Sequence, residues 1–193
     1  MKRIADINRS TKETQITCRV NLDGIGQSRI RTSLGFLDHM IDALSKHSGI
    51  DIELSCEGDV AIDDHHTVED CALVLGSAID QALGDRVGIA RFGCAYAPLD
   101  ESLARAVIDF SGRPCAVISL ALVRDQIGQV ACENITHFFV SFAMTARAAL
   151  HVDVIRGEND HHKSEASFKA LALALKSAVR ITGDCIPSTK GVL

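Results

Sequence analysis

The stretch DDHHTVEDCALVLGSAIDQAL, residues 63–83, begins with two adjacent histidines and a glutamate and continues with apolar residues at helical spacing. A second stretch, ENDHHKSEA at residues 158–166, opens in the same way. A shift of 96 residues superposes the two, and it matches His65 with His161, His66 with His162, Glu69 with Glu165, Leu75 with Leu171, and Ala78 with Ala174. The chain is therefore predicted to be a tandem duplication, with too few units for a solenoid.

The repeat also extends upstream, because HMIDAL (39–44) aligns with HFFVSF (137–142) and adds the matched pair His39 and His137. Periodicity predicts strands and helices in the same order in both halves. The expected strands are 13–22, 28–34, 50–56, 91–97, 102–110, 115–123 and 150–155, and the expected helices are 36–47, 68–83, 132–149 and about 162–181. We expect an α/β fold of the two-layer α+β type, built from a duplicated strand-strand-helix-strand-helix unit. The 193 residues would form one domain with two pseudo-symmetric halves, about 1–88 and 89–193.

Composition excludes several classes of partner. The net charge is −5 and no run of Lys or Arg occurs, so neither nucleic acid nor an anionic membrane surface is expected as a partner. The seven cysteines are scattered without a C-x-x-C pair, which is typical of core residues in a reduced compartment. No apolar run approaches the roughly 20 residues that span a bilayer, and no apolar leader opens the chain, so we expect a cytoplasmic protein.

The duplicated motif predicts two metal ions. Residues four apart share one face of a helix, so His65 can chelate an ion together with Glu69, as His161 can with Glu165. The second histidine of each pair is turned by about 100° and should reach a different ion. Repeat symmetry then gives one ion Glu165, His161 and His66, gives the other Glu69, His65 and His162, and leaves the upstream histidines as fourth ligands. If the halves pack across subunits, these sites would lie at interfaces.

Three imidazoles and one carboxylate suit Mn, Zn, Fe or Co, and affinity order alone does not choose among them. The alternative is a pair of surface histidines at a helix start, with Asp64 or Asp160 as the N-cap. His151, on an expected strand, is interpreted as structural, and His47 stays open.

Basic residues and a Ser/Thr-containing tail suggest an anionic ligand. PSTKG (187–191), Arg91, Arg113 and Lys169 would suit a phosphate, although each taken alone is more often a solvated surface charge.

Taken together, the motifs resemble those of the imidazoleglycerol-phosphate dehydratase family. FLDHM, DDHHTVED, RFG-x-AYAPLDE, SGRP, G-x-N-x-HH-x-x-E-x-x-FKA and PSTKG occur in that family's order, and the resemblance covers essentially the whole chain. It implies halves like domain 2 of ribosomal protein S5. It also implies dehydration of D-erythro-imidazole-glycerol phosphate to imidazole-acetol phosphate, a late step of histidine biosynthesis.

The resemblance further implies two Mn²⁺ ions, although other divalent metals are possible. One ion would be held by His39, His66, His161 and Glu165, and the other by His65, Glu69, His137 and His162. Glu13 would act at the substrate as a catalytic residue, and the phosphate would be contacted by Arg91, Arg113, Lys169, Ser188 and Lys190. The expected assembly is a large octahedral homo-oligomer, a 24-mer with active sites at subunit interfaces.

Two rival functions use the same residues. A dinuclear metal-dependent phosphoesterase would activate water at the metals, although such sites usually have more Asp ligands. A structural metal site would only stabilise an oligomer. From the residues alone, Glu13 is also compatible with an exposed charge at the head of a strand.

Overall fold

The structure, a computed structural model, describes residues 2–193. Its first half contains the elements β1 (Ile4–Ser10), β2 (Thr14–Asn21), β3 (Ser28–Arg31), α1 (Gly35–Ser48), β4 (Asp51–Gly58) and α2 (His65–Leu83). Its second half contains β5 (Phe92–Leu99), β6 (Ser102–Asp109), β7 (Cys115–Ser119), β8 (Gln126–Ile127), β9 (Val130–Ala131), α3 (Cys132–Thr145), β10 (Ala149–Arg156) and α4 (Asp160–Ala178).

The two large sheets have the same topology. The N-terminal sheet has the order β1-β2-β4-β3 and the C-terminal sheet has the order β5-β6-β10-β7. In each sheet the first three strands pair antiparallel and the last pair is parallel. The prediction of a duplicated α+β fold is therefore confirmed, while the proposed boundary near residue 88 falls between α2 and β5.

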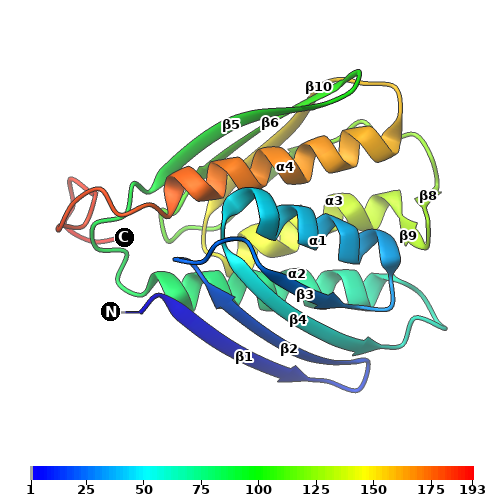
Figure 1. The fold of residues 1–193 in the computed structure, drawn as a ribbon, viewed down its shortest axis with the longest axis horizontal. Coiled ribbons are helices and arrows are strands. Elements are labelled where there is room, and N and C mark those ends of the chain that lie inside the picture. Colours follow the sequence, from blue (N-terminus) through cyan, green and yellow to red (C-terminus); the bar gives the residue numbers. More distant parts are fainter. Residues whose placement is uncertain (1) are drawn as a thin grey trace.

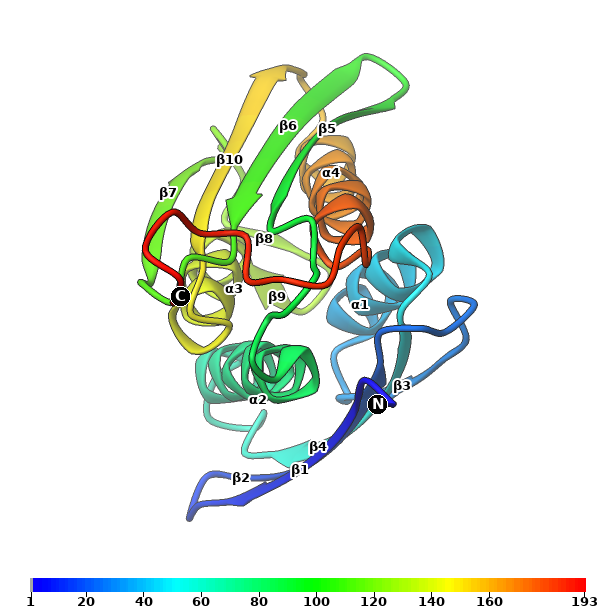
Figure 2. The ribbon, with the colours of Figure 1, turned by 90° about the vertical axis from the view of Figure 1, so that its left-hand side faces the viewer.

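The helices lie between the two sheets (Figure 1). Viewed along the helices, α1 and α2 cover the N-terminal sheet, and α3 and α4 cover the C-terminal sheet (Figure 2). The two halves meet where α2 packs on α3 and α1 packs on α4. All four helices begin at the same end of the molecule, on the right in Figure 1, and end where the C-terminal tail lies.

The repeating unit has one more strand than the predicted one. Strand β1 was missed because only Ala5 is buried in it, so no apolar alternation marks this strand at the edge of the sheet. The helix expected over 132–149 ends at Thr145, since Arg147 adopts a left-handed backbone with φ 51° and the next strand starts at Ala149. The short β8–β9 hairpin was also missed, because two-residue strands carry no periodic signal.

The junction of α2 and α3 requires a glycine. A Cβ on Gly76 would lie 2.6 Å from the Phe142 carbonyl oxygen, so only a residue without a side chain allows this approach. Phe138, Phe139 and Phe168 fill the adjoining core with ring centroids 4.7–5.9 Å apart. Within residues 2–193, no helix is both long and apolar enough to cross a membrane.

Candidate metal centres and phosphate-binding end

The eight predicted metal ligands all lie within the first two turns of the four helices, at the end of the molecule where these helices begin. They comprise His39 on α1, His65, His66 and Glu69 on α2, His137 on α3, and His161, His162 and Glu165 on α4. Six of them form two clusters, and each cluster combines side chains from both halves of the chain.

The first cluster consists of His39, His161 and Glu165, with ligand atoms within 4.8 Å of one another. Glu165 Oε2 lies 3.2 Å from His39 Nε2 and 3.3 Å from His161 Nε2. Lys169 Nζ lies 2.6 Å from the other carboxylate oxygen. Burial alone would raise the pKa of Glu165, but the hydrogen bonds and charges of Lys169 and His39 outweigh it and hold the pKa below its ordinary value.

The second cluster consists of His65, Glu69 and His137, again with ligand atoms within 4.8 Å. Glu69 Oε1 lies 3.1 Å from His137 Nε2, and Glu69 Oε2 lies 3.7 Å from His65 Nε2. The two imidazole rings stack with their centroids 5.0 Å apart. Side chains of both clusters are partly exposed, so an ion bound to either cluster would have an open side.

His66 and His162 do not join the clusters, and the structure places both against carboxylates of their own half. Asp59 lies 3.0 Å from His66 Nδ1, and Glu101 lies 2.6 Å from His162 Nδ1. These hydrogen bonds raise the pKa of both histidines, and the bond from His162 holds the pKa of Glu101 far below its usual range. Because a carboxylate orients Nδ1 in each ring, Nε2 is left to bind another group.

The helix starts differ from the expected caps. At α4, the Asn159 side chain accepts hydrogen bonds from the backbone N–H groups of His161 and His162. At α2, Asp63 accepts from the His65 N–H at 2.9 Å. Asp64 is the N-cap residue of α2, as expected, although its carboxylate hydrogen-bonds Ala131 and Asn134 and not its own helix. The expectation for Asp160 was wrong, because Asn159 is the N-cap of α4.

Four of the five predicted phosphate ligands lie at the end of the molecule opposite the metal clusters, where the helices end. The Arg91 N–H donates to the Ala178 carbonyl at the end of α4, and Arg91 Nη1 donates to the Pro187 carbonyl at 2.9 Å. The backbone of Leu193 lies against Gly112, so the end of the C-terminal tail is next to the residue that precedes Arg113. Lys169 is the exception, because it pairs with Glu165 in the first cluster.

Arg91 is held in place by several contacts, but its guanidinium group keeps free hydrogen-bond donors. It has a left-handed backbone with φ 70°, and its Nε and Nη2 donate to Asp109 at 2.6 and 3.1 Å. Together with the bond to Pro187, these contacts use three of the five guanidinium N–H groups, so two remain for an anion.

The residues that sequence reasoning missed are those that support the ligands. Asp59, Glu101 and Asn134 each hydrogen-bond a histidine of the motif. A signal existed for Glu101, because it precedes β6 as Glu13 precedes β2, at matching positions of the two sheets. Glu13 lies in the β1–β2 turn, with Oε1 3.7 Å from His66 Nε2.

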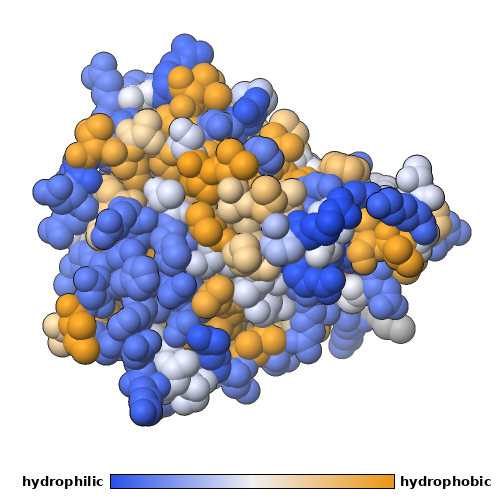
Figure 3. All heavy atoms as spheres, turned by 180° about the vertical axis from the view of Figure 1, so that it is seen from behind, coloured by the Kyte–Doolittle hydropathy of each residue, from blue (hydrophilic) through white to orange (hydrophobic). Residues whose placement is uncertain are grey.

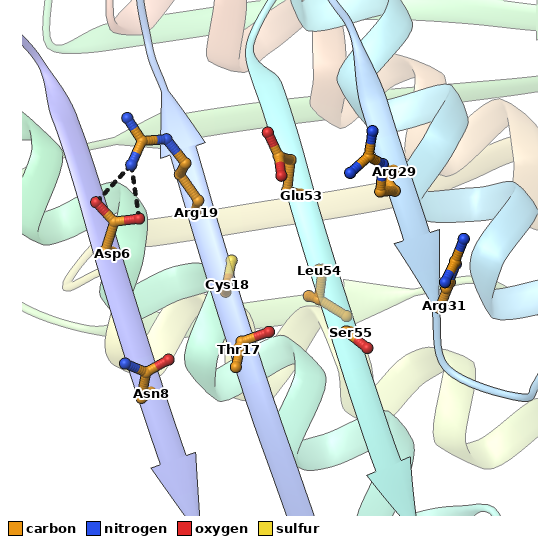
Figure 4. Close-up of a pocket in the computed structure, with 10 residues that line it drawn as sticks. All are labelled: Asp6, Asn8, Thr17, Cys18, Arg19, Arg29, Arg31, Glu53, Leu54 and Ser55. Atoms are coloured by element: carbon orange, nitrogen blue, oxygen red, sulfur yellow. Dashed lines mark hydrogen bonds and ion pairs between the residues drawn. The ribbon is translucent and has the colours of Figure 1, made fainter.

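The hollow shown in Figure 4 contains none of these residues. It has a volume of about 320 Å³ and lies on the outer face of the N-terminal sheet. Most of its side chains occupy alternate, outward-facing positions of the four strands, whereas Cys18 and Leu54 are buried. Arg19 Nη1 donates to both carboxylate oxygens of Asp6 at 2.9 Å. We interpret it as the concave, solvated face of a twisted sheet.

Sequence comparison places the chain among known enzymes. The family model described as imidazoleglycerol-phosphate dehydratase matches residues 32–175. The imidazoleglycerol-phosphate dehydratase of Zymomonas mobilis is 52% identical over the full length of both chains. That of Phytophthora nicotianae is 59% identical over 99% of this chain, which spans 42% of the relative.

Solved structures agree with the sequence match. The crystal structure of imidazoleglycerol-phosphate dehydratase from Staphylococcus aureus superposes with a TM-score of 0.84 at 36% identity, and covers 93% of this chain and 99% of its own. A structure of the Pyrococcus furiosus protein gives a TM-score of 0.82 at 33% identity, and covers 97% and 100%. The chain belongs to the imidazoleglycerol-phosphate dehydratase family.

Proposed function

We propose that the chain dehydrates D-erythro-imidazole-glycerol phosphate to imidazole-acetol phosphate in histidine biosynthesis, with two divalent metals per active site. The observation that carries the proposal is the pair of repeat-related clusters, each with two imidazoles and one carboxylate converging within 4.8 Å. This donor set fits Mn²⁺ and other first-row divalent ions. Bound there, two ions would supply Lewis-acid stabilisation of the negative charge that develops on the imidazole ring when the adjacent carbon loses its proton.

The fourth ligand of each cluster is proposed to come from a second copy of the chain. The clusters are open to solvent, while His66 and His162 hold Nδ1 on a carboxylate and leave Nε2 for a metal. We therefore propose that His66 completes the first cluster of another copy and His162 completes the second.

The distance between the metal clusters and the proposed phosphate ligands also supports an active site that is shared between copies. His161 and Ala178 both lie on α4 and are 17 residues apart, which is about 25 Å at 1.5 Å per residue. Arg91 hydrogen-bonds the backbone of Ala178 and therefore lies at the far end of this helix. The substrate joins its ring to its phosphate through three carbons, so it is shorter than about 10 Å. Apart from Lys169, the proposed phosphate ligands of one chain are too far from its own clusters to bind the same substrate, and an active site shared between copies removes this difficulty.

Surface character supports an assembly. Large apolar side chains on the outer face of the C-terminal sheet are exposed, including Phe92, Tyr96 and Val117. Seen from behind, apolar residues gather over the upper half of the molecule, where that sheet lies (Figure 3). Exposed apolar patches of this kind are typical of protein interfaces. We propose an octahedral homo-oligomer, a 24-mer, whose active sites form where subunits meet.

Glu13 is proposed as the acid/base residue. It lies beside Nε2 of His66, so it would stand next to whichever ion that histidine binds. A carboxylate positioned in this way contributes about 10²–10⁴-fold to a proton transfer. Arg91, Arg113, Ser188, Lys190 and Lys169 are proposed to bind the phosphate, and Lys169 would have to move from Glu165 to do so.

The direct test is to strip divalent metals from the full chain with a chelator, add Mn²⁺ back, and assay imidazole-glycerol phosphate for the dehydrated product. We expect product only after Mn²⁺ is restored, and loss of turnover with retained assembly in Glu13→Gln. Absence of any Mn²⁺-dependent product would refute the proposal. Release of inorganic phosphate without dehydration would support a phosphoesterase instead, and a Glu13→Gln variant with full turnover would remove Glu13 from the mechanism.

A further inference from the structure

The two clusters differ at one pair of repeat-matched positions. The alignment that pairs His39 with His137 also pairs Phe36 with Asn134, three residues earlier in each helix. Each of these residues contacts the first histidine of the motif in the opposite half. The Phe36 ring packs edge-on against His161 with centroids 5.1 Å apart, whereas Asn134 Oδ1 lies 2.9 Å from His65 Nδ1. The same place in the fold is therefore apolar at one cluster and polar at the other.

The hydrogen-bond directions around Asn134 are fixed by Asp64. The Asn134 amide donates from Nδ2 to Asp64 Oδ1 at 2.9 Å, and an amide oxygen can only accept. The other Asp64 oxygen accepts from the Ala131 N–H at 2.8 Å. The Asn134 oxygen must then face His65, whose Nδ1 carries the proton. This leaves the Nε2 lone pair of His65 directed toward Glu69 in the second cluster.

Asn134 is buried, with 3% of the residue exposed, which restricts the movement of its side chain. In the other half, Asp160 is committed to Lys163 at 2.9 Å and to the backbone N–H groups of Val123 and Arg124. Among residues 2–193, no group hydrogen-bonds Nδ1 of His161, so the tautomer of that ring is not fixed within the chain.

The surroundings of the two carboxylates also favour metal binding at the second cluster. Glu165 Oε1 is occupied by Lys169 at 2.6 Å, and a metal would compete with this ammonium group for the carboxylate. The residue four positions after Glu69 is Leu73, which carries no charge. Glu69 is therefore free of such competition from its own helix.

We propose that the two metal sites are inequivalent, with the second cluster binding the first ion tightly and the first cluster binding the second ion more weakly. This inference rests on the proposed metal-dependent function. Loss of a partner that orients a metal-bound histidine typically costs 10–100-fold in affinity, so we expect the two dissociation constants to differ by about 10-fold or more. Asn134 is a positioning residue here, because it acts through His65.

The test is a titration of the metal-stripped full chain with Mn²⁺, in which free Mn²⁺ is quantified by electron paramagnetic resonance. The wild-type chain should show two classes of one ion per chain. Asn134→Leu removes the hydrogen bond with little change in volume, and it should weaken the tight class by about 10–100-fold so that the two classes merge. Phe36→Leu is the matched control and should keep both classes. Circular dichroism and size-exclusion chromatography establish that the samples share fold and assembly state.

Two results would overturn the proposal: a single class of two equal ions in the wild-type chain, or an unchanged tight class in a folded Asn134→Leu variant. If that variant does not fold, Lys169→Met tests the other cluster, where the weaker class should tighten and an unchanged class contradicts the inference. A chain that binds no Mn²⁺ at all would instead refute the proposed function, so the two failures are distinguishable.

Discussion

Two inactive variants should restore activity to each other if metal and phosphate are bound by different copies. One variant is His161→Ala, which damages the first cluster. The other is the double substitution Arg113→Ala with Lys190→Ala, which damages the phosphate-binding end. The two ends of one chain lie about 25 Å apart along α4, and the proposed substrate is shorter than about 10 Å, so we predict that each active site contains residues of two copies.

The size of the rescue follows from random mixing. When the two variants assemble in equal amounts, a site receives an intact metal cluster from about half of the copies and an intact phosphate-binding end from about half of their neighbours. About one quarter of the sites therefore have both, and activity should recover to about one quarter of the wild-type value. Each variant alone should be inactive.

The assay is co-expression of the two variants with different affinity tags, purification through both tags, and measurement of Mn²⁺-dependent turnover per site. A mixture of separately purified variants that are kept from exchanging subunits is the control and should show no rescue. If the co-assembled protein also shows none, metal and phosphate are bound by the same chain and the distance argument is wrong.

Three further predictions concern stability. Gly76→Ala should destabilise the chain by about 1–3 kcal/mol, because its Cβ would lie 2.6 Å from the Phe142 carbonyl oxygen, whereas Gly35→Ala meets nothing within 4 Å and should leave the thermal midpoint nearly unchanged. Burial raises the pKa of Asp51, but backbone N–H donors outweigh burial and lower the pKa overall. The carboxylate therefore stabilises the fold above its unfolded pKa of about 3.9, and this contribution is lost as pH falls below that value. Asp51→Asn should therefore flatten stability against pH between about pH 5 and 2 in denaturant titrations, and an unchanged slope would contradict the assignment. Lys163→Met leaves the fully buried Asp160 charge without its partner and should cost about 3–5 kcal/mol in the same titrations, so a loss below 1 kcal/mol would refute a structural role for this pair.

Much of the fold was predictable because buried apolar residues recur in the sequence at the period of their helix or strand. The helices could be located to within a few residues, since their apolar stripes face a sheet or another helix. Strand β1 could not, because an edge strand with a single buried residue looks like a loop in the sequence.

The candidate site was predictable only in part. The i,i+4 spacing indicated that His65 and His161 would each approach their glutamate, and they lie 3.7 and 3.3 Å from it. The positions of His66 and His162 could not be predicted, because their neighbours Asp59 and Glu101 come from turns whose approach depends on the tertiary fold. Their assignment as metal ligands stays a prediction.

The most direct measurement of the central claim is a crystal structure of the Mn²⁺-loaded assembly, with the ions located by anomalous scattering. We expect two Mn²⁺ ions per chain. One should be bound by His39, His161 and Glu165 with His66 of a neighbouring copy, and the other by His65, Glu69 and His137 with His162 of a neighbouring copy. Anomalous peaks away from both clusters, or ions ligated by a single copy only, would contradict the account.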